Sequence, residues 1–232
     1  MPHSKATVVL VHGAWAECAS WAQIILPLQK HGLGVVCAPI PLTSLSDDVA
    51  ALDRVLARVE GDIVLVGHAY AGAVIGAARN KCVKLLVYVA ALAPDEGETV
   101  AEVFYREPSH AQAPKLAPDD GGFIWMPPEG FERAFAQNAA PDLKSVLLAT
   151  QRPINVKCIQ EKVPRPIWKD KPVWFLIAEN DRMISAKTQR FQAGRMGATV
   201  RTHAVDHSLM LTAPGTVVDV LVEAIRTTLK NA

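Results

Sequence analysis

The chain has 232 residues, of which 50% are hydrophobic and 20% are charged, and this predicts one domain with a large core and room for an inserted lid. Twenty-four basic and twenty-three acidic residues give a formal net charge of +1, which excludes the basic surface that binds nucleic acid or an anionic membrane. We therefore expect a small-molecule partner, no nucleic acid and no membrane.

Six short apolar segments have the composition of β-strands. The first five are continuously apolar, like strands of a parallel sheet covered on both faces, whereas the sixth alternates with polar residues and suits a sheet edge. In chain order the expected strands are 6–11, 34–38, 63–66, 85–92, 172–178 and 199–205.

Helical patterns separate most of these strands. Alternation of strands and helices predicts right-handed crossovers and a mostly parallel, doubly wound α/β sheet of about six strands. The expected helices are 18–31, 46–59, 70–80, 185–195 and 213–229.

One segment, 93–170, breaks the alternation and divides the core into 1–92 and 171–232. It holds ten of the sixteen prolines and seven of the fourteen aromatic residues. Disordered segments are poor in aromatic residues, so we expect an irregular helical cap over a pocket. The aromatic side chains expected to be buried there are Phe104, Tyr105, Phe123, Trp125, Phe131 and Phe135.

The cysteines lie far apart in the sequence, at positions 18, 37, 82 and 158. Their spacing matches neither a disulfide framework nor a zinc site. The first apolar run is too short for a signal-peptide core, and no run reaches the roughly 18 apolar residues of a membrane span. We expect a cytoplasmic protein that needs no cofactor or metal.

Two loops at the carboxyl ends of predicted strands carry the chemistry. Residues 12–15 (HGAW) follow the first strand, and residues 67–72 (GHAYAG) follow the third. A doubly wound sheet places these strands side by side, so both loops are expected to face one pocket. The second loop has the strand, small-residue turn and helix of a Gly-x-Ser-x-Gly nucleophile elbow, with Ala69 in place of the serine.

Four blocks of the sequence together resemble the α/β-hydrolase family, over essentially the whole chain. The resemblance is greatest to a compact bacterial esterase branch related to plant methylesterases and hydroxynitrile lyases. The blocks are 9–15 (VLVHGAW), 64–72 (VLVGHAYAG), 180–184 (NDRMI) and 206–208 (DHS). The resemblance implies a single α/β-hydrolase domain with a cap, here without the initial antiparallel hairpin of the family.

The resemblance also implies a catalytic triad, which this fold places in the chain order nucleophile, acid, base. Ala69 holds the nucleophile position, Asp181 is the expected acid and His207 the expected base. Asp95 is a rival acid, because some hydrolases of this fold take the acid from that strand. Asp206 is a poor rival, because neighbouring side chains point apart.

The alanine removes the nucleophile and leaves the main chain intact. The backbone N–H of Tyr70, with that of Ala14 or its neighbour, would bind an oxyanion. Loss of the serine lowers turnover of a serine protease on the order of a million-fold. Two explanations stay open: an inactivated variant of a working enzyme, or a pseudoenzyme that binds a ligand or uses only the dyad of His207 and Asp181.

The activity expected of the complete site is hydrolysis of a small or medium, largely apolar ester or lactone by two-step acyl transfer. The side chains and backbone expected to contact the substrate are those of Gly13, Trp15, Phe104, Trp125 and Met210.

Two alternatives come from the same resemblance. A receptor would bind its ligand in the inactive site. A hydroxynitrile lyase would add a cap lysine to the triad, and the candidates are Lys144, Lys157 and Lys162. For any of these functions we expect a monomer or a homodimer.

Overall fold

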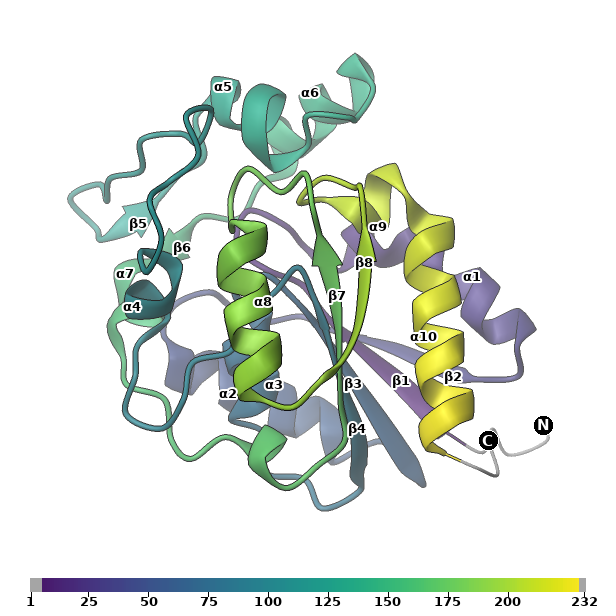
Figure 1. Cartoon of the computed structure of the whole chain (residues 1–232). Coiled ribbons are helices and arrows are strands. Elements are labelled where there is room, and N and C mark those ends of the chain that lie inside the picture. Colours follow the sequence, from purple (N-terminus) through teal and green to yellow (C-terminus); the bar gives the residue numbers. More distant parts are fainter. Residues whose placement is uncertain (1–5, 230–232) are drawn as a thin grey trace.

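Six parallel strands form one twisted sheet at the centre of the computed structural model, which describes residues 6–229 (Figure 1). The order across the sheet is β2-β1-β3-β4-β7-β8, so β1 and β3 lie side by side and β8 is an edge, as the sequence predicts. The strands are β1 (Ala6–Val11), β2 (Gly34–Ala38), β3 (Asp62–His68), β4 (Val83–Val89), β7 (Val173–Ala178) and β8 (Thr199–His203).

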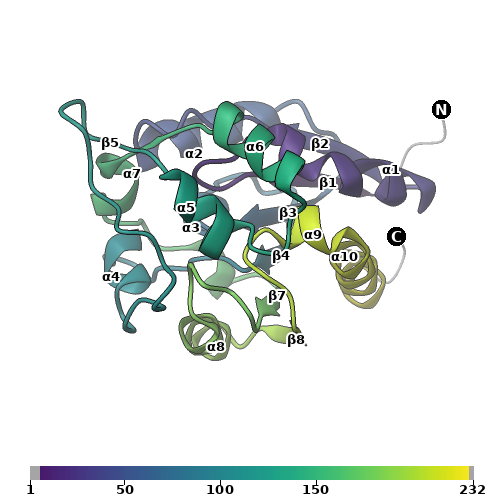
Figure 2. The ribbon, with the colours of Figure 1, turned by 90° about the horizontal axis from the view of Figure 1, so that it is seen from above.

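Helices cover both faces of this sheet, which confirms the predicted doubly wound α/β architecture (Figure 2). On one face lie α1 (Ala22–Lys30), α9 (Leu209–Thr212) and α10 (Pro214–Thr228), and on the other lie α2 (Leu45–Leu56), α3 (Ala71–Gly76) and α8 (Ala186–Arg195). Successive residues of a strand point to opposite faces. Val8 and Val64 accordingly pack with α1 and α10, whereas Val9 and Leu65 pack with α2 and α3.

Some boundaries differ from the predicted ones for local reasons. A 3-10 turn, η1 (Cys18–Trp21), precedes α1. Strand β4 ends at Val89 instead of residue 92, because Ala90 has a φ of 44°. Helix α3 ends at Gly76 instead of residue 80, and the side chain of Asn80 accepts the N–H of Cys82 in the turn that follows. Within residues 6–229, no helix is long and apolar enough to cross a membrane.

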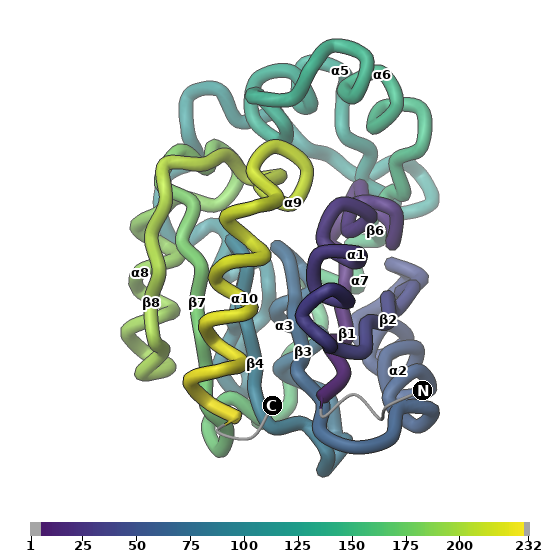
Figure 3. The backbone as a smooth tube through the Cα atoms, turned by 90° about the vertical axis from the view of Figure 1, so that its right-hand side faces the viewer, coloured from purple at the N-terminus to yellow at the C-terminus, as the bar shows by residue number. Residues whose placement is uncertain are grey.

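The segment 93–170 lies between β4 and β7 and arches over the carboxyl ends of the strands (Figure 3). It consists of short helices and a two-stranded antiparallel sheet, joined by irregular backbone. Its elements are α4 (Val100–Phe104), β5 (Phe123–Ile124), α5 (Pro128–Gly130), η2 (Phe131–Phe135), α6 (Pro141–Thr150), β6 (Ile154–Asn155), α7 (Val156–Gln160) and η3 (Ile167–Lys169).

The cap aromatic residues are not all buried. Phe131 and Phe135 are buried and pack edge to face, with ring centroids 5.3 Å apart. Tyr105 and Trp125, however, are 59% and 52% exposed, which corrects the expectation that both would be buried. The Trp125 indole lies at the surface and donates its N–H to Asp119.

Candidate active site

The turn after β3 holds Ala69 in a strained conformation. Its φ is 49°, in the left-handed region that residues other than glycine enter at a cost of about 1–2 kcal/mol. Backbone bonds fix it there: the Ala69 N–H donates to Val89 (3.3 Å), and its carbonyl accepts the N–H groups of Leu92 (2.9 Å) and Gly72 (3.1 Å). This strained strand-to-helix turn is the geometry of a nucleophile elbow.

Small residues permit the tight turn. A Cβ added to Gly67 would lie 2.8 Å from the Ala71 carbonyl oxygen, and one added to Gly72 would lie 2.3 Å from that of Leu92. Both positions therefore require glycine. Ala71, which stands where the motif usually has glycine, is completely buried and keeps its methyl group.

His207 and Asp181 meet at the carboxyl end of the sheet. The Nδ1 N–H of His207 donates to Asp181 Oδ2 at 2.8 Å, and both side chains are buried. Oδ1 of the same carboxylate accepts the N–H groups of Met183 and Ile184 at 2.7 and 2.9 Å, and Oδ2 also accepts the Gln189 amide at 2.9 Å. These donors hold the carboxylate in one orientation toward the imidazole.

His68 contacts His207 through a hydrogen bond to its backbone. Its Nε2 donates to the His207 carbonyl at 2.8 Å, and the two ring centroids lie 4.7 Å apart. Burial, together with the nearby His207, holds the pKa of His68 well below its usual value. His68 is therefore a neutral hydrogen-bond donor with a structural role.

The loop after β1 is held by His12. The Ile40 N–H donates to Nε2 of His12 at 3.3 Å, so the proton of the ring lies on Nδ1, which donates to the Gly13 carbonyl at 3.0 Å. Burial lowers the pKa of His12 to about 4. A neutral imidazole thus fixes the loop, without a place in proton transfer.

Two backbone N–H groups flank position 69. Among residues 6–229, no acceptor pairs with the N–H of Ala14 or of Tyr70. The N–H of Trp15 donates to the Arg152 carbonyl at 3.0 Å, so in this loop Ala14 rather than Trp15 is the candidate oxyanion donor. The loop after β1 lies close to position 69, because a Cβ added to Gly13 would lie 3.0 Å from the Cβ of Ala69.

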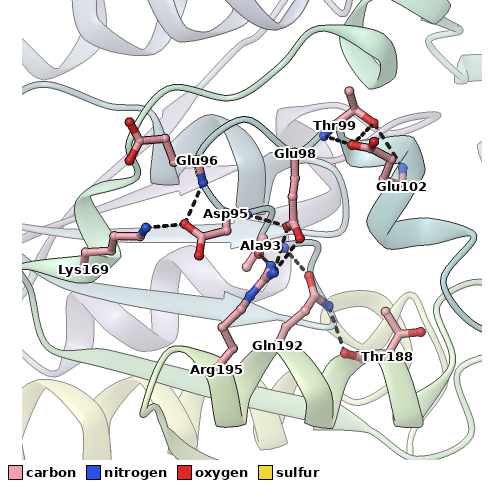
Figure 4. A network of polar contacts seen from close by, with 10 residues as sticks. All are labelled: Ala93, Asp95, Glu96, Glu98, Thr99, Glu102, Lys169, Thr188, Gln192 and Arg195. Carbon is pink, nitrogen blue, oxygen red and sulfur yellow. Dashed lines mark hydrogen bonds and ion pairs between the residues drawn. The ribbon is translucent and has the colours of Figure 1, made fainter.

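The two rival acids have other partners. Asp95 pairs with Lys169 at 2.5 Å and lies in a polar network at the base of the cap, beside Glu98 and Arg195 (Figure 4). Asp206 accepts the Asn138 N–H at 3.0 Å and the Thr212 hydroxyl at 2.5 Å. Neither contacts His207 as Asp181 does.

A largely apolar cavity lies above Ala69, between the core and the cap. It contains about 610 Å³ of space between atoms, including its open mouth. The core contributes Ala14, Trp15, Ala69, Tyr70, Leu92, Met183, Ile184 and His207. The cap contributes Val100, Ala101, Phe104, Tyr105, Leu116, Ile124, Ile154 and Ile159.

The cavity includes some of the expected substrate contacts and leaves out others. Trp15 and Phe104 line it. Trp125 does not, because it lies at the surface, and Met210 does not, because it packs with α1 and α10 on the opposite face of the sheet. Gly13 lies beneath the cavity, against Ala69 and His68.

Most of the remaining cavity residues were not singled out from the sequence. Met183 and Ile184 lie two and three residues after the candidate acid, so their position in the sequence could have indicated them, whereas nothing in the sequence marks the cap aliphatic residues Leu116, Ile154 and Ile159. In residues 6–229, no three His, Cys, Asp or Glu side chains converge as the ligands of a metal do.

Two comparisons with known proteins concern the whole chain. The sequence model described as "Alpha/beta hydrolase family" matches residues 8–220. A search of curated protein sequences gives no match.

Solved structures of similar fold cover nearly the whole chain. Polyneuridine aldehyde esterase has a TM-score of 0.81 and 17% identity, over 94% of this chain and 98% of that one. The methylesterase MES16 from Arabidopsis has a TM-score of 0.78 and 16% identity, over 95% and 99%. A pyrethroid hydrolase from Sphingobium faniae JZ-2 has a TM-score of 0.75 and 17% identity, over 94% and 96%. At these identities the likeness shows the fold alone.

Proposed function

Because the chain belongs to the alpha/beta hydrolase family, we propose that its site is that of a carboxylic-ester hydrolase whose nucleophilic serine is replaced by Ala69. The observation that carries the proposal is the buried pair of His207 and Asp181, joined at 2.8 Å, beside a cavity that Ala69 also lines. Proteins named as esterases and pyrethroid hydrolases share the fold.

The complete site would act by acyl transfer. The oxygen of a serine at position 69 would attack the ester carbonyl carbon while Nε2 of His207 takes its proton. The carbon–oxygen bond to the alcohol then breaks, and His207 gives the proton to the leaving alcohol. Water repeats the sequence on the acyl-enzyme and releases the acid, so the reaction needs no cofactor.

The developing charges have partners in the structure. Asp181 would stabilise the imidazolium of His207, and its other hydrogen bonds keep it oriented for that role. The N–H groups of Ala14 and Tyr70 would bind the oxyanion, and each donor of this kind contributes on the order of 10²–10³-fold in turnover.

The cavity supports an uncharged, largely apolar ester or lactone as the substrate. None of its described lining residues is Lys, Arg, Asp or Glu, so a charged substrate would lose its hydration without gaining an ion pair. The hydroxynitrile lyase alternative needs a cap lysine in the site, and it loses support because no described lysine lines the cavity. Lys144, for example, donates to the Gln137 carbonyl and does not line the cavity.

Ala69 separates binding from chemistry in this site. A methyl group cannot attack a carbonyl, whereas the cavity and the backbone donors do not depend on the missing hydroxyl. We therefore expect the chain to bind an ester and to turn it over with a rate lower by on the order of 10⁶-fold than its serine form.

The test is reversion. Ala69→Ser and the parent chain are incubated with chromogenic aryl esters of short and long acyl chains and with lactones, at matched concentrations. Ala101→Ser is the control, because it adds a hydroxyl to the same cavity away from the elbow. We expect Ala69→Ser alone to gain activity, by several orders of magnitude.

A revertant that hydrolyses none of these compounds would overturn the proposal. Calorimetric binding of the same esters to the parent chain would then favour the receptor, and turnover that depends on His207 but not on a serine would favour a dyad enzyme.

A further inference from the structure

Asp48 is a completely buried carboxylate that the proposed mechanism does not use. It lies in the first turns of α2, with no exposed surface. Within residues 6–229 it pairs with no lysine, arginine or histidine. A buried carboxylate without a cation is costly, and it is retained where its hydrogen bonds serve a purpose.

The carboxylate of Asp48 joins three segments of the chain. Its Oδ1 accepts the N–H of Leu42, in the loop after β2, at 2.7 Å. Its Oδ2 accepts the Tyr70 hydroxyl at 2.7 Å. The thiol of Cys158, in the cap helix α7, lies 3.6 Å from the same oxygen.

The bond between Asp48 and Tyr70 is strong by its chemistry. Burial raises the pKa of Asp48 to about 6 against the effect of its hydrogen bonds, and burial and Asp48 raise that of Tyr70 well above its usual value. Near neutral pH the phenol is therefore a protonated donor and the carboxylate an ionised acceptor. Hydrogen bonds to a charged group are about twice as strong as neutral ones.

The main chain of Tyr70 is part of the elbow. It directly follows Ala69, and its N–H is one of the two proposed oxyanion donors. Ala69 stores backbone strain at a φ of 49°, and such strain persists only where the surroundings over-determine the conformation. The phenol gives Tyr70 a second anchor, at the far end of its side chain.

We propose that Asp48 is a positioning residue: it holds Tyr70 by its hydroxyl and so fixes the backbone N–H that follows position 69. The proposal rests on the proposed ester hydrolysis for its catalytic meaning. The same anchor reaches the cap, because the carbonyl of Leu42 accepts the N–H of Asn155 at 2.9 Å, next to α7. Asp48 thereby ties the oxyanion donor and one wall of the cavity to a single point.

The first test measures turnover in the Ala69→Ser background. Tyr70→Phe removes only the hydroxyl, and we expect kcat to fall about tenfold with KM within about twofold, since small displacements at a site cost this much or more. Tyr88→Phe is the matched control: the Tyr88 hydroxyl is also buried, but no residue in 6–229 bonds to it. Equal kcat values for the two variants would overturn the proposal.

Substitutions at Asp48 extend this test. In Asp48→Asn the amide keeps the Leu42 bond and donates to the phenol oxygen, so we expect most of kcat to remain. Asp48→Ala should match Tyr70→Phe if it folds, and Tyr70→Phe decides the matter if it does not.

A tetrahedral adduct provides a readout that loss of stability would not move. An aryl boronic acid bound to the serine of the Ala69→Ser revertant places an oxygen in the oxyanion hole, so Tyr70→Phe should weaken its binding by about the same factor as kcat. Unchanged boronate affinity would contradict the positioning role.

The second test does not depend on activity. In the ¹⁵N-labelled Ala69 chain, Tyr70→Phe should speed amide hydrogen exchange at residues 69–72 relative to β4, and Tyr88→Phe should not. An inert Ala69→Ser together with faster exchange would overturn ester hydrolysis and keep the anchor. An active Ala69→Ser with unchanged kcat and exchange in Tyr70→Phe would overturn the anchor alone.

Discussion

The core and the cap contribute equally to the cavity wall and differ in what they bring to it. Eight lining residues come from each. The core supplies position 69 and both proposed oxyanion donors, on loops at the carboxyl ends of the adjacent strands β1 and β3, and it supplies His207 in the loop after β8. The cap supplies aliphatic and aromatic side chains from short elements. The proposed chemistry therefore belongs to the core, and the shape of the substrate site is shared with the cap.

The two regions are also held in place differently. Asp181 accepts three N–H groups besides that of His207. The cap is held by contacts that are spread over several of its elements, such as the Trp15 indole N–H to the Ile124 carbonyl at 2.9 Å and the pair of Glu98 with Arg195 of α8. Donors that converge on one carboxylate keep the proposed catalytic groups aligned, whereas binding residues on connecting segments are free to vary with the ligand.

The largest expected effect concerns the pair of His207 and Asp181 in the core. In the Ala69→Ser background, Asp181→Asn should lower turnover roughly 10⁴-fold, because the imidazole loses its orienting acceptor. Steady-state ester hydrolysis measures it. Asp95→Asn is the control and should leave turnover near that of the revertant, because Asp95 pairs with Lys169 instead. Equal losses in the two variants would contradict the assignment of Asp181 as the acid.

Packing at the elbow is the next most sensitive feature. Gly72→Ala would place a Cβ 2.3 Å from the Leu92 carbonyl oxygen, so the free energy of unfolding should fall by about 1–3 kcal/mol. Gly194→Ala in α8 meets no atom within 4 Å and should instead stabilise by roughly 0.5–1 kcal/mol. Urea unfolding of both variants checks this, and a harmless Gly72→Ala would contradict the tight elbow.

Buried ionisable groups make the core sensitive to acid. The folded pKa values of His12 (about 4) and His68 lie below 6.5, so the stability linked to them is present above pH 6.5 and is lost as the pH falls toward 4. Asp48, raised from 3.8 to about 6, acts in the opposite direction, since its contribution is lost as the pH rises through 6. Because two histidines oppose one carboxylate, the free energy of unfolding should fall on going from pH 7 to 5.

Asp48→Asn isolates the opposing contribution to this pH dependence. Without the carboxylate, unfolding free energies measured in urea should fall more steeply between pH 7 and 5, by about 1 kcal/mol more than in the parent. A slope as shallow in Asp48→Asn as in the parent would show that Asp48 does not titrate in this range.

The smallest expected effect concerns the part of the cavity wall that the cap contributes. In the revertant, Phe104→Ala should lower kcat/KM for a bulky acyl ester about tenfold relative to an acetyl ester, because loss of apolar contact in a pocket has effects of this size. Trp125→Ala, on the outer surface of the cap, should change neither. If the two variants behave alike, the cap does not set substrate preference through the cavity wall.

Much of the core was determined by the sequence alone. Continuous apolar segments and helical periods are local properties, and they predicted the six strands, the two helix layers and the adjacency of β1 and β3. The small residues around Ala69 and the chain order of 69, 181 and 207 likewise predicted which loops face one pocket. These features follow from backbone preferences and from the pattern of apolar residues, and both depend on residues that are close in the sequence.

The tertiary structure decided what depends on contacts between distant segments. It paired His207 with Asp181 rather than Asp95, placed Trp125 and Met210 away from the cavity, and joined Asp48 to Tyr70. A side chain in an irregular cap has no periodicity that fixes its direction, and a buried carboxylate in a helix gives no sign of its acceptor role until its donors are near. Local sequence patterns thus determined the scaffold and indicated where the candidate site lies. Packing between distant segments determined which side chains contact one another there.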